Sequence, residues 1–282
     1  MPETVETPSG KQAADENFPV GSWLLPAALR PHVAIFYAYA RAIDDIADDP
    51  KLDSAEKIRR LDGFAAALRD PCGADPAYAK ANAIRDSMAV TNVDPQHCLD
   101  LIAAFKQDAV KTRYADWDDL MAYCMLSAAP VGRYLIDLHG ETKHAYAASD
   151  ALCCALQVIN HLQDCQDDYR SLNRVYLSDE WMSDAGVTVA ALDSDTASAG
   201  LRRVIDRNLD STADLMKTAQ ALTGHLKNKR FALEAAMIVR IADRLIGELR
   251  QRDPLAERVV LRRPQYILCG IGGIWDVVRR SA

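Results

Sequence analysis

Apolar residues along the chain recur at the three- and four-residue spacing of a helix face, and proline and glycine fall between these stretches. The alternation of apolar and polar residues that marks strands is almost absent. The pattern predicts an all-α fold with helices near residues 31–48, 54–69, 76–89, 94–111, 116–128, 131–146, 148–171, 197–224, 230–251 and 265–280.

The start of the chain differs from this pattern. Residues 1–16 are polar and lack the apolar core of a secretory signal, so we expect a flexible N-terminal arm there. No convincing linker divides the remainder, and residues 17–282 are expected to form one helical domain. No apolar run approaches the ~18 residues that a membrane-spanning helix needs.

Composition and charge narrow the function. The formal net charge of -7 repels DNA and RNA, so we expect no nucleic-acid partner. An anionic substrate would instead require metal ions or a local cluster of arginine and lysine. The seven cysteines form no CxxC pair and lie mostly in apolar runs, which is typical of a reducing compartment. We therefore expect a cytoplasmic protein.

The first unusual feature is an acidic row in the predicted helix 31–48. Tyr37, Arg41, Asp44 and Asp48 fall at helical spacing on one stripe, and Asp45 lies beside it. Carboxylates on a mostly buried helix are costly unless a cation compensates them. Asp oxygens suit magnesium, which also keeps substrate phosphate oxygens in its shell. The alternative is a solvated helix end.

A second row repeats this arrangement in the predicted helix 148–171. Gln157, Asn160, Asp164 and Asp168 follow one another at helical spacing, opposite apolar residues. Two such helices facing each other would form a metal-filled mouth over an apolar bundle interior. A diphosphate bridging the metal ions fits this site. Arg41, Arg170 and Arg174 are candidates for its remaining oxygens. The alternative for each arginine is an ordinary surface ion pair.

These motifs resemble the squalene/phytoene synthase family. The resemblance runs from about residue 17 to about residue 176. It rests on the DDxxD run 44–48, the QxxNxxxDxxxD run 157–168, Tyr123-Cys124 and Pro130-Val131-Gly132. It implies an isoprenoid-synthase helical bundle with a central active-site cavity and magnesium at both acidic motifs. Manganese is an alternative metal, and no nicotinamide cofactor is expected.

The resemblance also implies roles for individual residues. The residues expected to be catalytic and to line the active site are Tyr37, Arg41 and Tyr123. Those expected to bind metal are Asp44, Asp48, Asn160, Asp164 and Asp168. Those expected to bind substrate are Asp45, Gln157, Arg174 and Tyr176.

Within the family, residues 17–26, 127–133 and 160–164 look most similar to hydroxysqualene synthases of the bacterial hopanoid pathway. Condensing relatives usually carry Arg or Lys where Gln163 stands. The resemblance therefore implies magnesium-dependent conversion of presqualene diphosphate and water to hydroxysqualene and diphosphate. Other enzymes of the hopanoid pathway are the expected partners.

Three alternatives remain open. One is head-to-head condensation of two prenyl diphosphates, which gives presqualene diphosphate or phytoene. Another is a non-catalytic helical assembly factor, for which broken Asp motifs would be expected. A third is a di-iron bundle, which needs two Glu-x-x-His units, and only Glu141 to His144 fits.

The C-terminal residues 264–280 mix apolar residues with flanking arginines. Such a segment suits peripheral contact with the inner face of the membrane. It suits equally a core helix that closes the bundle.

Overall fold

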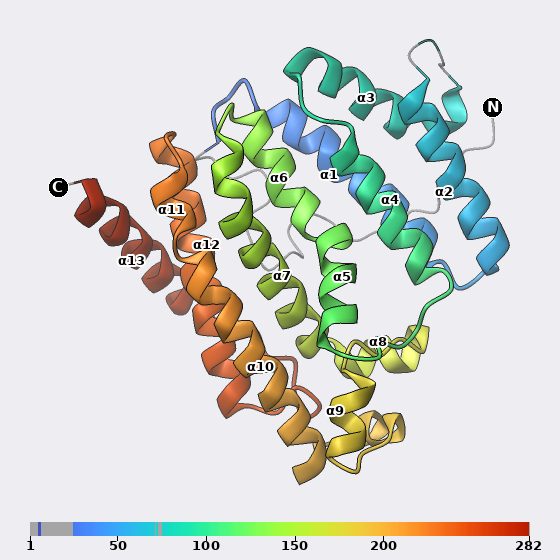
Figure 1. Cartoon of the computed structure of the whole chain (residues 1–282), viewed down its shortest axis with the longest axis vertical. Helices are drawn as coiled ribbons and strands as arrows, with labels where there is room; N and C mark the ends of the chain where they lie inside the picture. Colours follow the sequence, from blue (N-terminus) through green and yellow to red (C-terminus); the bar gives the residue numbers. More distant parts are fainter. Residues whose placement is uncertain (1–4, 7–24, 71, 73–74, 282) are drawn as a thin grey trace. The chain divides into compact units, whose positions relative to one another are not determined.

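The computed structural model describes residues 5–6, 25–70, 72 and 75–281 (Figure 1). Most of the expected arm over residues 1–16, and residues 17–24, lie outside the described part. The all-α expectation is confirmed, since the described residues contain helices and no strand. Their one β-type pairing is an isolated bridge between Tyr114 and Ser178. No described helix is both long enough and apolar enough to cross a membrane.

Contacts within the chain divide it into two compact units. Unit 1 comprises Met1–Lys111 and Pro130–Lys143, and unit 2 comprises Thr112–Ala129 and His144–Ala282. The expectation of one domain over residues 17–282, with a central cavity, stays a prediction.

Unit 1 is a group of helices with short connections. It holds α1 (Arg30–Asp48), α2 (Ser54–Arg69), a 3₁₀ turn (Pro76–Tyr78), α3 (Ala79–Thr91), α4 (Gln96–Asp108) and most of α6 (Ala129–Leu138). Local signals set several ends. The Asp53 side chain caps α2 by accepting a hydrogen bond from the Glu56 N–H, and Asn92 ends α3 at a φ of 56°.

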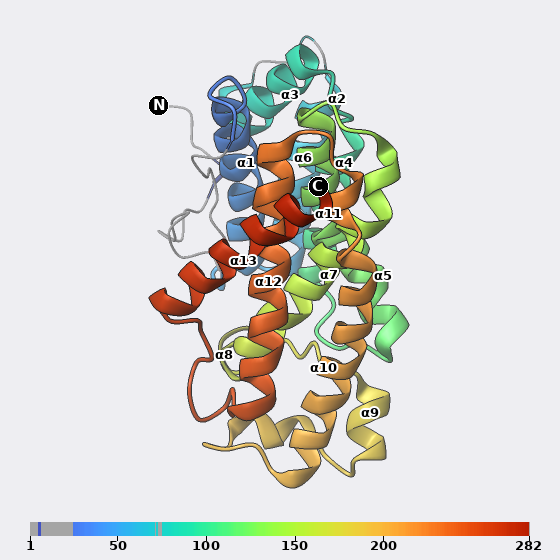
Figure 2. The same ribbon diagram turned by 90° about the vertical axis from the view of Figure 1, so that its left-hand side faces the viewer.

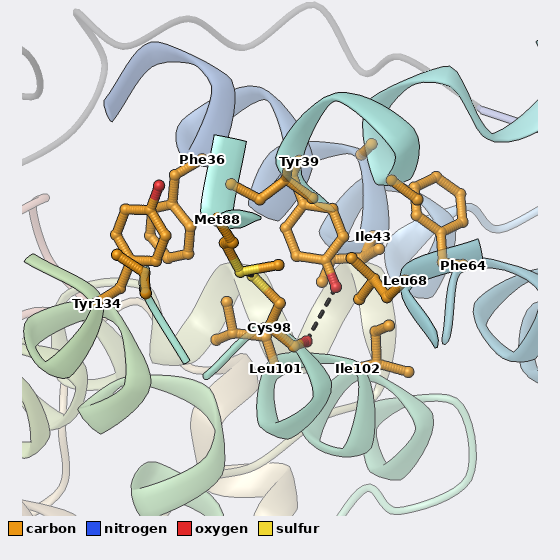
Figure 3. Packing of buried hydrophobic residues seen from close by; sticks show 14 of the residues in the cluster. Phe36, Tyr39, Ile43, Phe64, Leu68, Met88, Cys98, Leu101, Ile102 and Tyr134 are labelled. Atoms are coloured by element: carbon orange, nitrogen blue, oxygen red, sulfur yellow. Dashed lines mark hydrogen bonds between the residues drawn. The ribbon is translucent and has the colours of Figure 1, made fainter. Parts of the chain in front are cut away.

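The core of unit 1 holds α1 in place by its apolar side (Figure 3). Phe36 stacks on Tyr134 of α6 with ring centroids 3.9 Å apart. The Tyr39 hydroxyl donates to the Cys98 carbonyl at 2.9 Å, which satisfies a polar group in a buried setting. Ile43 is fully buried one turn further on. This packing leaves the acidic row on the side of α1 that faces away from the core.

Unit 2 is built around α7. Its helices are α5 (Trp117–Ser127), α7 (Tyr146–Gln163), α8 (Cys165–Leu172), α9 (Asp179–Asp184), α10 (Ala199–Ala219), α11 (Leu222–His225), α12 (Lys229–Gln251) and α13 (Arg263–Ser281), with 3₁₀ turns at Lys143–Ala145 and Val189–Asp193. α7 packs against α5, α10 and α12, and α13 packs against α12 (Figure 2).

The structure corrects the predicted helices in four places. The helix expected over 131–146 ends at Leu138, because Gly140 takes a φ of +67° and turns the chain. The helix expected over 148–171 is interrupted at Asp164, and the one over 197–224 is interrupted after Ala219. α9 was not predicted, although Ser178 caps it through its Oγ, which accepts from the Trp181 N–H at 3.2 Å.

Candidate active site

Two carboxylates of the acidic row on α1 are paired with an arginine of the same helix. Arg41 Nη1 lies 2.9 Å from Asp44 Oδ2, and Arg41 Nε lies 3.3 Å from Asp45 Oδ1. Asp45 is buried, whereas Tyr37, Asp44 and Asp48 are half-buried. The half-buried carboxylates therefore remain accessible to a ligand, while the buried Asp45 contacts the Arg41 guanidinium.

The row on α7 and α8 has the same graded exposure. Gln157, Asn160, Asp164 and Asp168 are all half-buried, and the apolar residues between them are buried. The helix is interrupted at Asp164, where φ is -109° and ψ is 11°. The Asp168 N–H still donates to the Asp164 carbonyl at 2.8 Å. The row therefore continues from α7 into α8 across a bend rather than along one straight helix.

Arg258 supplies the positive charge for this second row. Its Nε lies 3.1 Å from Asp164 Oδ1, and its Nη2 donates to Asp164 Oδ2 at 3.3 Å. The adjacent Gln163 side chain is buried, and its amide donates to the Val259 carbonyl. The segment between α12 and α13 is thus joined to the end of α7 by two contacts. Sequence reasoning missed Arg258, because no motif or spacing distinguishes it from the other arginines.

An aromatic cluster lies beside α7 in unit 2. His161 stacks on Tyr176 with centroids 3.5 Å apart and an interplanar angle of 10°. Tyr123 lies 5.8 Å from Tyr176 and 6.2 Å from His161, and Tyr114 lies 5.4 Å from both tyrosines. The structure therefore brings together two of the predicted residues, Tyr123 and Tyr176, which are far apart in sequence.

Pairing of two loops positions this cluster. Asn173 ends α8 at a φ of 52°, and its side-chain oxygen accepts from Arg113 Nη2 at 2.8 Å. The Val175 N–H then donates to the Thr112 carbonyl at 3.0 Å. These bonds place Tyr176 over the ring of His161.

His161 is neutral at physiological pH. Burial, and to a lesser degree the positive charge of Arg174, lower the pKa of His161 to about 3. Arg174 itself is buried. His161 Nε2 is buried and finds no hydrogen-bond partner among the described residues. The other arginine considered for the diphosphate, Arg170, contacts Asp193 at 3.3 Å on an exposed surface.

The predicted metal ligands in the two rows suit a hard divalent cation, since all of them offer carboxylate or amide oxygens. Within the described residues, no three His, Cys, Asp or Glu side chains converge as a preformed metal site. Magnesium normally uses few carboxylates and completes its shell with water and substrate phosphate oxygens. The residues therefore fit a metal that binds together with a diphosphate.

A cavity of about 620 Å³ lies elsewhere in unit 2, lined by Gln220 and by residues of α11, α12 and α13. None of the predicted site residues lines it. Its two arginines are already paired, Arg240 with Asp276 at 2.7 Å and Arg244 with Glu248 at 2.7 Å. This cavity is therefore not part of the candidate site.

Comparison with known proteins identifies the family. The family model described as squalene/phytoene synthase matches residues 11–265, which is most of the chain. The chain belongs to the squalene/phytoene synthase family. The match includes both acidic rows, the aromatic cluster and Arg258.

Similar family members include two curated hydroxysqualene synthases. That of Rhodopseudomonas palustris is 40% identical over 282 residues, covering 100% of this chain and 96% of the relative. That of Zymomonas mobilis is 39% identical over 253 residues, covering 89% of this chain and 84% of the relative. Among solved structures, a squalene synthase from Alicyclobacillus acidocaldarius has a TM-score of 0.74 at 30% identity, covering 85% of this chain and 90% of that one.

Proposed function

We propose that this protein converts presqualene diphosphate and water to hydroxysqualene and diphosphate in a reaction that depends on magnesium. The observation that carries the proposal is the 40% identity to a hydroxysqualene synthase over the whole chain. The presence of all the oxygen donors of both acidic rows supports it further. Loss of those donors is what the alternative of a non-catalytic assembly factor predicts.

We propose that each acidic row binds metal ions for the diphosphate. We assign Asp44 and Asp48 of α1 as ligands, together with Asn160, Asp164 and Asp168 of the second row. When bound there, divalent cations, magnesium or manganese, neutralise the negative charge of the leaving diphosphate.

Arginines of the chain assist with the same charge. Arg41 touches Asp44 and Arg258 touches Asp164, so both guanidinium groups already lie at the proposed ligands. A planar guanidinium contacts diphosphate oxygens in a two-pronged manner. Asp45 orients Arg41 through its contact at 3.3 Å. We therefore propose that the arginines exchange part of their carboxylate contacts for the substrate.

Three further residues complete the proposed substrate site. Arg174 brings a buried positive charge beside the aromatic cluster. Gln157 lies one turn before Asn160 on the half-buried side of α7. Tyr37 lies one turn before Arg41 on the half-buried side of α1. We propose that Arg174 and Gln157 contact the diphosphate and that Tyr37 lines the pocket.

The carbon chemistry follows from loss of diphosphate. The carbon–oxygen bond breaks with its electron pair going to diphosphate, and the cyclopropylcarbinyl cation rearranges with ring opening. Water then forms a new carbon–oxygen bond and releases one proton. The π faces of Tyr123 and Tyr176 suit stabilisation of a cation in a site poor in water. No hydride enters this balance, so no nicotinamide cofactor is needed.

Gln163 favours hydration over condensation. Its uncharged side chain is buried and engaged with the Val259 carbonyl, in the position where condensing relatives usually carry a cation. A site with one cation fewer is less suited to hold two diphosphates at once. This is consistent with a substrate that carries a single diphosphate.

The test uses purified protein with presqualene diphosphate and magnesium, without nicotinamide. We expect equal amounts of hydroxysqualene and diphosphate, no product with EDTA, and recovery on adding magnesium. A parallel reaction with farnesyl diphosphate alone should give no presqualene diphosphate. Formation of presqualene diphosphate there, or of squalene only after NADPH is added, would replace the proposal with a condensing or reducing activity.

We also propose a cytoplasmic location, because all seven cysteines are free thiols. Because the substrate and product are long apolar molecules, we propose that the reaction takes place at the inner face of the membrane beside other enzymes of the hopanoid pathway.

A further inference from the structure

α13 carries an apolar face that no described element covers. Its members recur at helical spacing, and each is at least half exposed, from 52% for Ile274 to 66% for Leu268. Most of the large apolar side chains that are exposed in the described residues lie on this one helix. The face consists of Ile267, Leu268, Ile271, Ile274, Trp275 and Val278.

The opposite side of α13 is fixed to α12, as Figures 1 and 2 show. A Cβ atom at Gly273 would lie 2.9 Å from the Met237 backbone nitrogen, so the two helices approach as closely as only glycine permits. Arg240 of α12 binds Asp276 of α13 through two hydrogen bonds of 2.7 and 2.8 Å. The helix therefore cannot turn its apolar face inward without breaking these contacts.

The charges around this face differ from those of the whole chain. Residues 262–282 contain four arginines and a single acidic residue, Asp276, although the chain carries a net charge of -7. Asp276 is engaged by Arg240. Arg262 and Arg263 are exposed at one end of the helix and Arg279 at the other. The surface thus combines an apolar stripe with basic ends.

We propose that the exposed face of α13 docks on an anionic lipid bilayer, with the helix lying in the plane of the interface. Apolar side chains enter the boundary of the acyl chains while the arginines contact anionic headgroups. Trp275 is of the residue type that prefers this interface, and the Arg279 guanidinium lies 5.3 Å from its ring centroid.

A second copy of the chain fits this face less well. Antiparallel pairing of two α13 helices would bring Arg262 and Arg263 at the start of one helix close to Arg279 at the end of the other. The apolar face itself has no acidic side chain to offset that repulsion. A bilayer with negative headgroups matches the charge, whereas a copy of the same surface does not.

Docking would place the enzyme at the lipid bilayer, into which an apolar product partitions. That benefit rests on the proposed reaction, but the docking itself does not. It can be measured without substrate, so failure of one proposal is distinguishable from failure of the other.

The experiment measures partitioning of the full chain onto vesicles of phosphatidylcholine, alone or mixed with phosphatidylglycerol. We expect binding to the mixed vesicles, weakening with salt, and a blue shift of tryptophan fluorescence that Trp275→Phe abolishes. The double variant Ile271→Glu/Ile274→Glu should lower the partition constant by about tenfold or more. The double variant Arg262→Gln/Arg263→Gln should weaken binding to mixed vesicles more than to neutral ones.

The matched control is Val90→Glu/Val110→Glu, which adds the same two charges at exposed apolar positions of unit 1. It should bind like the unmodified chain. Unchanged circular dichroism of each variant excludes misfolding, and Trp275→Ser provides a milder variant if the double one unfolds. Three outcomes would overturn the proposal. They are no binding to either vesicle, equal loss in the control, and a dimer in lipid-free solution that Ile271→Glu/Ile274→Glu converts to a monomer.

Discussion

Both acidic rows carry aspartates that pair with an arginine, but the arginine comes from different parts of the chain. On α1, the positive charge comes from Arg41, within one turn of the carboxylates that it contacts. On α7 and α8, it comes from Arg258, 94 residues away in sequence from Asp164. The first row lies on one uninterrupted helix, and the second bends at Asp164.

This difference separates local from long-range control. The contacts of Arg41 join residues three and four apart on one helix, which are neighbours on its surface. The contact of Arg258 exists only when the segment between α12 and α13 has folded back on the end of α7. The second row is therefore the one whose electrostatics depend on the rest of unit 2.

The largest expected effect is loss of activity when a proposed ligand is changed. Asp44→Asn and Asp164→Asn should each lower kcat/KM on the order of a thousandfold, because each removes a charged metal ligand. The measurement is diphosphate release from presqualene diphosphate at saturating magnesium.

Each row supplies its own control for this prediction. Asp49→Asn lies just past α1, where the side-chain oxygen accepts from the Lys51 N–H, and an amide oxygen can do the same. Asp167→Asn is exposed on α8 beside the ligand row. Both should keep activity within about twofold. If a control variant were as inactive as the ligand variant of the same row, the loss of activity would reflect removal of any negative charge and not loss of a metal ligand.

The two arginines should differ in stability. Arg41→Leu withdraws the charge that faces the buried Asp45, so the free energy of unfolding should fall by about 2 to 3 kcal/mol, near the lower end for buried pairs. Arg258→Leu removes a mostly exposed partner of Asp164 and should cost under about 1 kcal/mol. Urea unfolding followed by circular dichroism compares them. Equal losses would contradict the distinction between the rows.

Between pH 7 and 5, a smaller effect, of at most about 2 kcal/mol, should appear in unit 2. The pKa of His161 in the folded chain is about 3, below its usual value near 6.5. As the pH falls below 6.5, the unfolded chain therefore binds a proton at His161 before the folded chain does. Stability present above pH 6.5 should therefore be lost as the pH falls toward 3, by at most about 1.4 kcal/mol per pH unit.

The variant His161→Phe keeps a flat ring next to Tyr176 but cannot titrate. Its unfolding free energy, measured in EDTA between pH 7 and about 5 to limit carboxylate titration, should change less with pH than that of the unmodified chain. Parallel pH profiles for the two proteins would show that His161 is solvated and protonates normally.

The smallest effect concerns the link that brings Arg258 to the second row. Gln163→Leu removes the hydrogen bond to the Val259 carbonyl and should cost about 1 kcal/mol of stability. It should also speed protease cleavage between α12 and α13. Gln251→Leu, on an exposed position at the end of α12, should change neither quantity. Intact resistance to protease in Gln163→Leu would mean that other contacts hold the segment.

The helical fold was predictable because its signals are local. Apolar periodicity placed α1, α2 and α12 within a residue or so of their observed ends. The interruption at Asp164 was not predictable, because both sides of it have good helix formers and helical periodicity. α9 was missed because only its cap and acidic first turn mark it, and it is too short to show periodicity.

Sequence alone determined which residues of the two acidic rows lie at helical spacing. It could not determine what long-range folding adds to them. The stacking of Tyr176 on His161, the approach of Arg258 to Asp164 and the outward apolar face of α13 all depend on how loops and helices pack. The physical reason is range, since helical periodicity acts over three or four residues, whereas these contacts join residues separated by many turns of chain.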